Sequence, residues 1–131
     1  MLTILLVDDE PAILDIAMLF LKKFGSITAV TVLSAKEALT LLGHQSFDAI
    51  VSDYEMPEMN GIQFLQELRV HGDQTPFIIF TGKGRGQVEA EALNAGAIFY
   101  IEKGSNPRVL FSELSDKIQQ AVALRTAQSG Q

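Results

Sequence analysis

The chain alternates five times between short apolar runs typical of β-strands and segments with the three- and four-residue spacing of amphipathic helices. The expected strands are residues 3–7, 27–33, 48–52, 77–80 and 98–101. The first, third and fourth runs are continuously apolar, a pattern that indicates strands covered by helices on both faces of a parallel sheet. The alternation therefore predicts a (βα)5 domain of the α/β class.

Start and stop signals for helices lie between these runs. Pro11 can begin the first helix and Gly25 can end it, while Ser34 and Glu37 form a capping-box pattern before the second. Further helices are expected at 61–70, at about 87–94 and from 106 onward. The apolar stripe of the first helix comprises Ile13, Ala17, Phe20 and Phe24, and that of the last Leu110, Leu114, Ile118 and Val122.

Five such units have one usual solution, a flavodoxin-like, doubly wound, five-stranded parallel sheet in the order 2-1-3-4-5. This order places the first and third strands side by side. Ligands of such sheets bind beyond the carboxyl ends of the strands, where the winding reverses.

Carboxylates follow both of these neighbouring strands. Asp8 and Asp9 end the first apolar run, and Asp53 ends the third. Thr81 and Lys103 follow the fourth and fifth, and we expect all of these side chains at one edge of the sheet. Hard oxygen ligands with open water positions suit Mg²⁺ or Mn²⁺, and a carboxylate can accept a phosphoryl group.

Each of these residues also has a purely structural interpretation. Asp8 and Asp9 could favour the start of a helix, and Asp53 could stabilise a turn. Thr81 could belong to an ordinary turn and Lys103 could be a solvated lysine. Only their joint placement favours a phosphoryl-transfer site.

Composition excludes several other classes. The 131 residues fit one domain, expected at 1–124 with 125–131 as a tail or truncated linker. The absence of cysteine excludes disulfides and thiolate metal sites, and the net charge of −6 argues against direct nucleic-acid binding. No apolar run is long enough to cross a membrane, so we expect a soluble, cytoplasmic protein.

Four short motifs resemble those of the receiver domain of two-component response regulators. They are Val7-Asp8-Asp9-Glu10-Pro11, Asp53-Tyr54-Glu55-Met56-Pro57 with Gly61, Thr81-Gly82, and Tyr100-Ile101-Glu102-Lys103. The resemblance covers roughly residues 2 to 123, and the order of the motifs on successive strand ends makes it specific.

The resemblance implies a role for each carboxylate. Asp53 would be the phosphoacceptor, Asp9 a direct Mg²⁺ ligand and Asp8 a partner acting mainly through metal-bound water. Further metal contacts would come from Asp53 itself and from the backbone carbonyl of Glu55.

The resemblance also implies how the signal is received and passed on. Lys103 would pair with the phosphoryl group, Thr81 would be the switch hydroxyl, and Tyr100 the aromatic that turns inward with it, although Tyr100 could equally be a half-buried strand residue. The donor would be a histidine kinase or phosphotransfer protein. The output would be a downstream protein, a missing output domain, or a homodimer formed through the fourth helix, fifth strand and fifth helix. No catalysis beyond self-phosphorylation and self-dephosphorylation is expected.

Two departures from the family pattern stand out. Gly104 follows Lys103 where the family usually has a proline with a cis peptide, and Gly82 follows Thr81 where a small alanine is common. Glu55 and Lys83 flank the expected entry of hydrolytic water. One hypothesis is that they form an ion pair over the phosphoryl group and slow its loss, and the alternative is a solvated, non-interacting pair.

Other functions remain open at the level of sequence. The chain could be a receiver module cut from a multidomain sensor kinase, or a receiver-like scaffold. A Mg²⁺-dependent phosphatase with an aspartyl-phosphate intermediate needs similar residues, but usually carries D-x-D after its first strand, whereas Asp8 and Asp9 are adjacent.

Overall fold

A computed structural model of the chain describes residues 2–82, 86–104 and 106–129, the last three of these by their backbone alone. The elements in chain order are β1 (Leu2–Val7), α1 (Pro11–Gly25), β2 (Ile27–Val32), α2 (Ala35–Leu42), β3 (Ala49–Ser52), α3 (Gly61–Val70), β4 (Phe77–Thr81), α4 (Gly86–Ala95), β5 (Phe99–Glu102) and α5 (Pro107–Ser129). Each expected strand and helix is confirmed, and the ends of the strands lie within one residue of the prediction.

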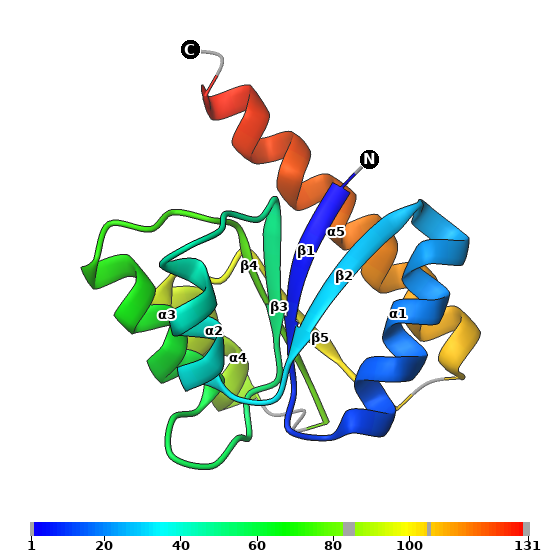
Figure 1. The fold of residues 1–131 in the computed structure, drawn as a ribbon, viewed down its shortest axis with the longest axis horizontal. Helices are drawn as coiled ribbons and strands as arrows, with labels where there is room; N and C mark the ends of the chain where they lie inside the picture. The colour runs from blue at the N-terminus through cyan, green and yellow to red at the C-terminus, as the bar shows by residue number, and fades with distance from the viewer. Residues whose placement is uncertain (1, 83–85, 105, 130–131) are drawn as a thin grey trace.

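The five strands form one parallel sheet in the order β2-β1-β3-β4-β5, which confirms the flavodoxin-like prediction. Figure 1 shows α1 and α5 on one face of the sheet and α2, α3 and α4 on the other. The chain therefore winds in opposite directions on the two sides of β1 and β3, and the carboxyl ends of these strands meet at one edge.

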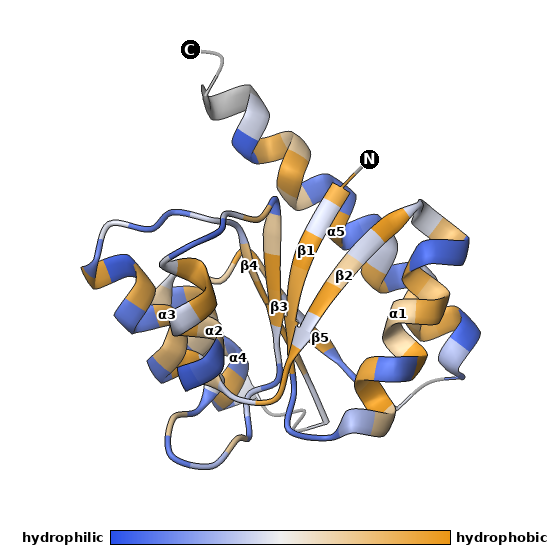
Figure 2. Cartoon of the chain, in the orientation of Figure 1, coloured by the Kyte–Doolittle hydropathy of each residue, from blue (hydrophilic) through white to orange (hydrophobic). Residues whose placement is uncertain are grey.

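Two apolar cores fill the space between the sheet and its helices. One lies under α1 and α5 and the other under α2, α3 and α4. The central strands are predominantly apolar, as their colour in Figure 2 shows. In α1, Leu14 and Leu21 are more deeply buried than Ile13, Phe20 and Phe24, so the predicted stripe is rotated by about one residue.

Helix caps explain where two of the helices begin. Ser34 Oγ accepts from the Glu37 amide at the start of α2 (3.1 Å), and Glu37 Oε1 accepts from the Leu33 amide. At α3, Asn60 and Gln63 form a complete reciprocal capping box, which the sequence analysis did not find.

Helix α5 is continuous past residue 124, and its final part extends beyond the sheet (Figure 1). The domain end at residue 124 stays a prediction. None of the helices in the described ranges has both the length and the apolar character that a bilayer-spanning helix needs.

Candidate functional site

The sheet brings the acidic residues together through the pairing of β1 with β3. Val7 pairs with Ser52, so the next residue of each strand leaves the sheet at the same level. The Asp53 amide donates to the Val7 carbonyl (2.9 Å), and the Asp8 amide donates to the Val32 carbonyl (3.3 Å). Hydrogen bonds among β1, β2 and β3 thereby fix the backbone of Asp8 and Asp53.

Strand alternation decides which way these side chains point. Successive residues of a strand face opposite sides of a sheet. Asp8 continues the series of Ile4 and Leu6, and Asp53 continues the series of Ala49 and Val51. These four apolar residues lie in the core under α1 and α5. Both carboxylates therefore extend an apolar face, and both are buried, with exposed fractions of 2% for Asp8 and 7% for Asp53.

Three carboxylates after β1 form a group that could hold a metal ion. One oxygen from each of Asp8, Asp9 and Glu10 lies within 4.8 Å of the others. Asp8 is buried and the other two are exposed, so the group spans from the core to solvent. The sequence analysis did not single out Glu10, and Asp53 lies outside this particular group.

Asp8 does not cap α1. The N-cap of this helix is Glu10, whose side chain makes no capping hydrogen bond, and Asp8 Oδ1 accepts from the Glu10 amide (3.0 Å). Asp8 is thus not the N-cap residue itself, but it accepts from the amide of the N-cap, as an acid near the start of a helix can, and its second oxygen binds Lys103.

Lys103 connects the two buried acids. Its Nζ lies 2.7 Å from Asp8 Oδ2 and 3.8 Å from Asp53 Oδ1, and its side chain is 15% exposed. Its amide donates to the Thr81 carbonyl (2.8 Å), one residue beyond the pairing of Thr81 with Glu102. Lys103 is therefore not a solvated lysine.

Gly104 accounts for the absent proline. Every peptide bond of the described residues is trans, and Gly104 has a φ of +132°. Residues with a Cβ rarely adopt this conformation, and the proline ring holds φ near −65°, so a proline could not replace Gly104 without moving the backbone. Lys103 reaches the acids without the usual cis peptide.

Burial raises the pKa of Asp53 above its ordinary value of 3.8. The Lys103 ammonium opposes this by lowering the pKa, the charge of Asp8 raises it again, and hydrogen bonds from the Thr81 hydroxyl and the Tyr54 amide lower it. Removal from water is the strongest of these influences. A carboxylate in such a site gains from a nearby cation.

Replacement of Asp53 by asparagine is expected to stabilise the cation-free protein at neutral pH. Because the pKa of Asp53 is higher in the folded than in the unfolded state, ionisation of this carboxyl lowers the free energy of unfolding. The loss begins as the pH rises through the ordinary pKa of 3.8 and is complete above the folded-state pKa. Below the ordinary pKa the carboxyl is protonated in both states and the advantage of asparagine disappears. Thermal unfolding of both proteins at neutral and acidic pH measures this, and a lower melting temperature of Asp53→Asn at neutral pH would contradict it.

The remaining predicted residues lie around this centre. Thr81 is buried at the end of β4 and bonds to Asp53. Tyr100 is half-buried in β5 and packs on the side of α2, α3 and α4. Glu55 is exposed, and Lys83 lies outside the described residues, so the hypothesis that these two residues form an ion pair over the phosphoryl group stays a prediction.

Gly61 holds the loop after β3 against Asp53. Its amide donates to the Tyr54 carbonyl (2.8 Å), and a Cβ at this position would overlap the Asp53 carbonyl oxygen. Ser52 Oγ donates to the same carbonyl oxygen (2.9 Å). The first residue of α3 thus fixes the backbone of Asp53.

Comparisons with known proteins agree with this fold. The family model for the response regulator receiver domain matches residues 4–115. The response regulator SaeR of Staphylococcus aureus (strain USA300) is 35% identical over 114 residues, which cover 86% of this chain and 49% of SaeR. The chain thus spans about half the length of the curated relatives it matches.

Two solved structures extend the comparison. A response regulator receiver domain protein from Clostridium thermocellum superposes with a TM-score of 0.85 at 27% identity, over 98% of this chain and 99% of that chain. The signal receiver domain of a histidine kinase from Syntrophus aciditrophicus gives 0.80 at 26% identity, over 94% and 91%.

A doubly wound parallel sheet with buried acids and a lysine at its carboxyl edge defines a flavodoxin-like domain with an acidic site. This chain belongs to the receiver domain family of the response regulators of two-component signalling systems.

Proposed function

We propose that Asp53 accepts a phosphoryl group from a histidine kinase or phosphotransfer protein in the presence of Mg²⁺ or Mn²⁺. The observation that carries the proposal is the position of Lys103 Nζ, which lies within ion-pair distance of both Asp8 and Asp53 at a buried edge of the sheet. An ammonium held at this point can also meet the oxygens of a phosphoryl group on Asp53.

The donor set fits a hard divalent cation. Asp8 is buried and acidic beside Asp9 and Glu10, and burial raises the pKa of Asp53, so these oxygens would be stabilised by positive charge. Asp8, Asp9, Asp53 and the backbone carbonyl of Glu55 would hold the ion. When bound, it neutralises negative charge on the transferring group.

The chain's own residues carry the remaining chemistry. An oxygen of Asp53 attacks phosphorus, the bond from phosphorus to the donor nitrogen breaks, and that nitrogen keeps the electron pair. Lys103 stabilises the negative oxygens during transfer, and the Thr81 hydroxyl donates to the phosphoryl group afterwards.

Phosphorylation by acetyl phosphate with Mg²⁺ tests this assignment. Intact mass is expected to increase by one phosphoryl group in the wild type and to stay unchanged in Asp53→Asn, because the amide is not a nucleophile for this reaction. Asp48→Asn is a matched control, since Asp48 binds the Thr3 amide (2.8 Å) just before β3, at the end of the sheet opposite Asp53. An equal gain in Asp53→Asn would refute the assignment.

The output would be a change of conformation that alters protein contacts of α4, β5 and α5. Thr81 ends β4 and Tyr100 lies in β5, which supports a role for both in connecting the phosphoryl group with this face. The switch roles of Thr81 and Tyr100 are part of the proposal.

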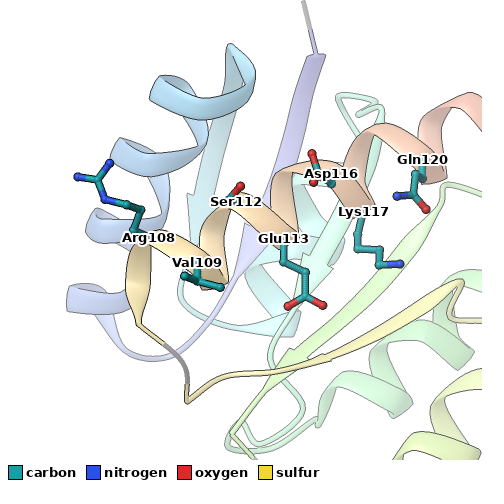
Figure 3. A pocket seen from close by; sticks show the side chains of 7 residues that line it. All are labelled: Arg108, Val109, Ser112, Glu113, Asp116, Lys117 and Gln120. Carbon is teal, nitrogen blue, oxygen red and sulfur yellow. The ribbon is translucent and has the colours of Figure 1, made fainter.

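Helix α5 contributes a hollow of about 520 Å³ with mixed charges to this surface. Figure 3 shows its lining, which comprises Arg108, Val109, Ser112, Glu113, Asp116, Lys117 and Gln120. Lys117, one of the lining residues, also lies over the Phe99 ring of β5 (4.7 Å). Charges of both signs on one helix can pair across a two-fold axis, which supports a homodimer as one form of output.

The wider context follows from the family. The output could reside in a downstream protein or an output domain of a longer chain, and the domain would act in the cytoplasm without catalysing turnover of other substrates. The chain could also be the receiver module of a longer sensor kinase. The likeness to the receiver domain of the Syntrophus histidine kinase supports this possibility.

A further inference from the structure

The backbone around Lys103 does little to aim its side chain. The last backbone hydrogen bond between this segment and β4 is the one from the Lys103 amide to the Thr81 carbonyl. Gly104 follows with a φ of +132°, and no heavy atom of the described residues lies within 4 Å of the position that a Cβ would occupy. The direction of the side chain must therefore come from the groups that the side chain itself contacts.

One of these groups carries no charge. Lys103 Nζ lies 5.4 Å from the centroid of the Phe80 ring, within the range of a cation–π contact. Phe80 pairs with Ile101 in the register of β4 and β5. Lys103 follows Ile101 by two residues, one residue beyond the end of β5, so it is the diagonal neighbour of Phe80. The period of two along the strand directs Ile101 and Lys103 to the same face of the sheet as Phe80.

Other aromatic rings hold Phe80 in place. It is 2% exposed, and its ring lies 5.8 Å from that of Phe111 in α5 at an interplanar angle of 53°. Phe111 in turn stacks on Phe20 of α1 at 5.5 Å. The Phe80 ring is thus packed between the sheet and the side chains of α5 and α1, and it cannot change its orientation without disturbing this core.

The geometry points to Phe80 as a positioning residue for Lys103, in an inference that rests on the proposed function. Asp8 and Asp53 attract the ammonium only while their oxygens are free, and a divalent cation at the same carboxylates would compete for them. The ring face does not bind Mg²⁺ as the carboxylates do. Phe80 therefore keeps the ammonium beside Asp53 when the cation is present. Its ring orients the Lys103 side chain, which the backbone at Lys103 and Gly104 does not do.

Three variants test the inference. Phe80→Leu removes the ring and Phe80→Tyr retains it. Phe77→Leu is the control, because it removes a buried ring from the other end of β4, in the core under α2, α3 and α4. With Mg²⁺ and acetyl phosphate, phosphorylation of Phe80→Leu is expected to be slower by about five- to thirtyfold, the range that corresponds to a partly desolvated cation–π contact. Phe80→Tyr should restore most of the rate, and Phe77→Leu should retain it.

A second measurement needs no phosphoryl transfer. In the metal-free protein, the terminal methylene protons of Lys103 should resonate upfield in NMR spectra because the Phe80 ring shields them. The shift should disappear in Phe80→Leu and persist in Phe77→Leu.

The two measurements separate this inference from the assignment of Asp53. An unshifted Lys103 in the wild type, or equal slowing by Phe80→Leu and Phe77→Leu, would refute a role for the Phe80 ring even if Asp53 is phosphorylated. A shifted Lys103 in a protein that acetyl phosphate does not modify would retain the contact and refute the phosphoacceptor instead. Because the wild-type spectrum alone can refute the contact, the test holds even if Phe80→Leu fails to fold.

Discussion

Replacement of Lys103 by methionine is expected to destabilise the cation-free protein by about 3 kcal/mol, the lower end of the range for removing one partner of a buried ion pair. Lys103 and Asp8 are 15% and 3% exposed at their side chains and lie 2.7 Å apart, so water cannot fully replace the ammonium. Methionine retains much of the apolar stem. The loss therefore reports the charge, and the melting temperature should fall by about 10 °C.

The same substitution changes the response to Mg²⁺. Lys103 is the strongest influence that lowers the pKa of Asp53, so its removal raises that pKa further and leaves both buried acids in greater need of a cation. Because a ligand that binds only the folded protein stabilises it, Mg²⁺ should recover more stability in Lys103→Met than in the wild type. Phosphorylation should nevertheless be lost, since the ammonium that meets the phosphoryl oxygens is gone.

Lys117→Met is the matched control for this experiment. Lys117 also lies over a phenylalanine ring, that of Phe99, but it sits on α5 away from the acidic edge. Thermal unfolding of the three proteins with and without Mg²⁺ makes the comparison. An equal loss in both variants, or a loss in Lys103→Met that Mg²⁺ leaves unchanged, would show that Lys103 does not compensate the charge of the acids.

The positions of Asp8, Asp53 and Lys103 could be predicted because they depend on strand order and register alone. Apolar runs fixed the strands to within a residue, and right-handed winding placed β1 beside β3. The first residue past each strand then had to emerge at the carboxyl edge. Sequence motifs at the strand ends supplied the rest of the prediction.

Other features depend on distances that no spacing rule contains. Glu10 joins Asp8 and Asp9 only because the chain turns between β1 and α1, and the Asn60–Gln63 box was not recognised among other polar pairs. The contact of Phe80 with Lys103 is a diagonal one between strands that are about twenty residues apart in sequence. The register of β4 and β5 could have revealed it, but only after the pairing was known.

Replacement of Gly61 by alanine is expected to destabilise the fold by about 2–3 kcal/mol, as overpacking against atoms that cannot move does. The new Cβ would overlap the Asp53 carbonyl oxygen and lie 3.1 Å from both the Tyr54 Cα and the Ile79 Cδ1. Two of these three atoms belong to the backbone, so relief requires α3 to withdraw or the loop after β3 to shift. Either movement displaces the carboxylate of Asp53.

The displacement is expected to slow phosphorylation by acetyl phosphate on the order of 100-fold, because transfer depends on Asp53, Lys103 and the metal ligands meeting at one point. Gly82→Ala is the control, since Gly82 follows Thr81 at the same edge and a Cβ there would have no heavy atom within 4 Å among the residues that the structure describes. It should alter stability by less than about 0.5 kcal/mol and leave the rate near that of the wild type. Wild-type stability and rate in Gly61→Ala would mean that the start of α3 yields without moving Asp53, and that the phosphoacceptor is held by the pairing of β1 with β3 alone.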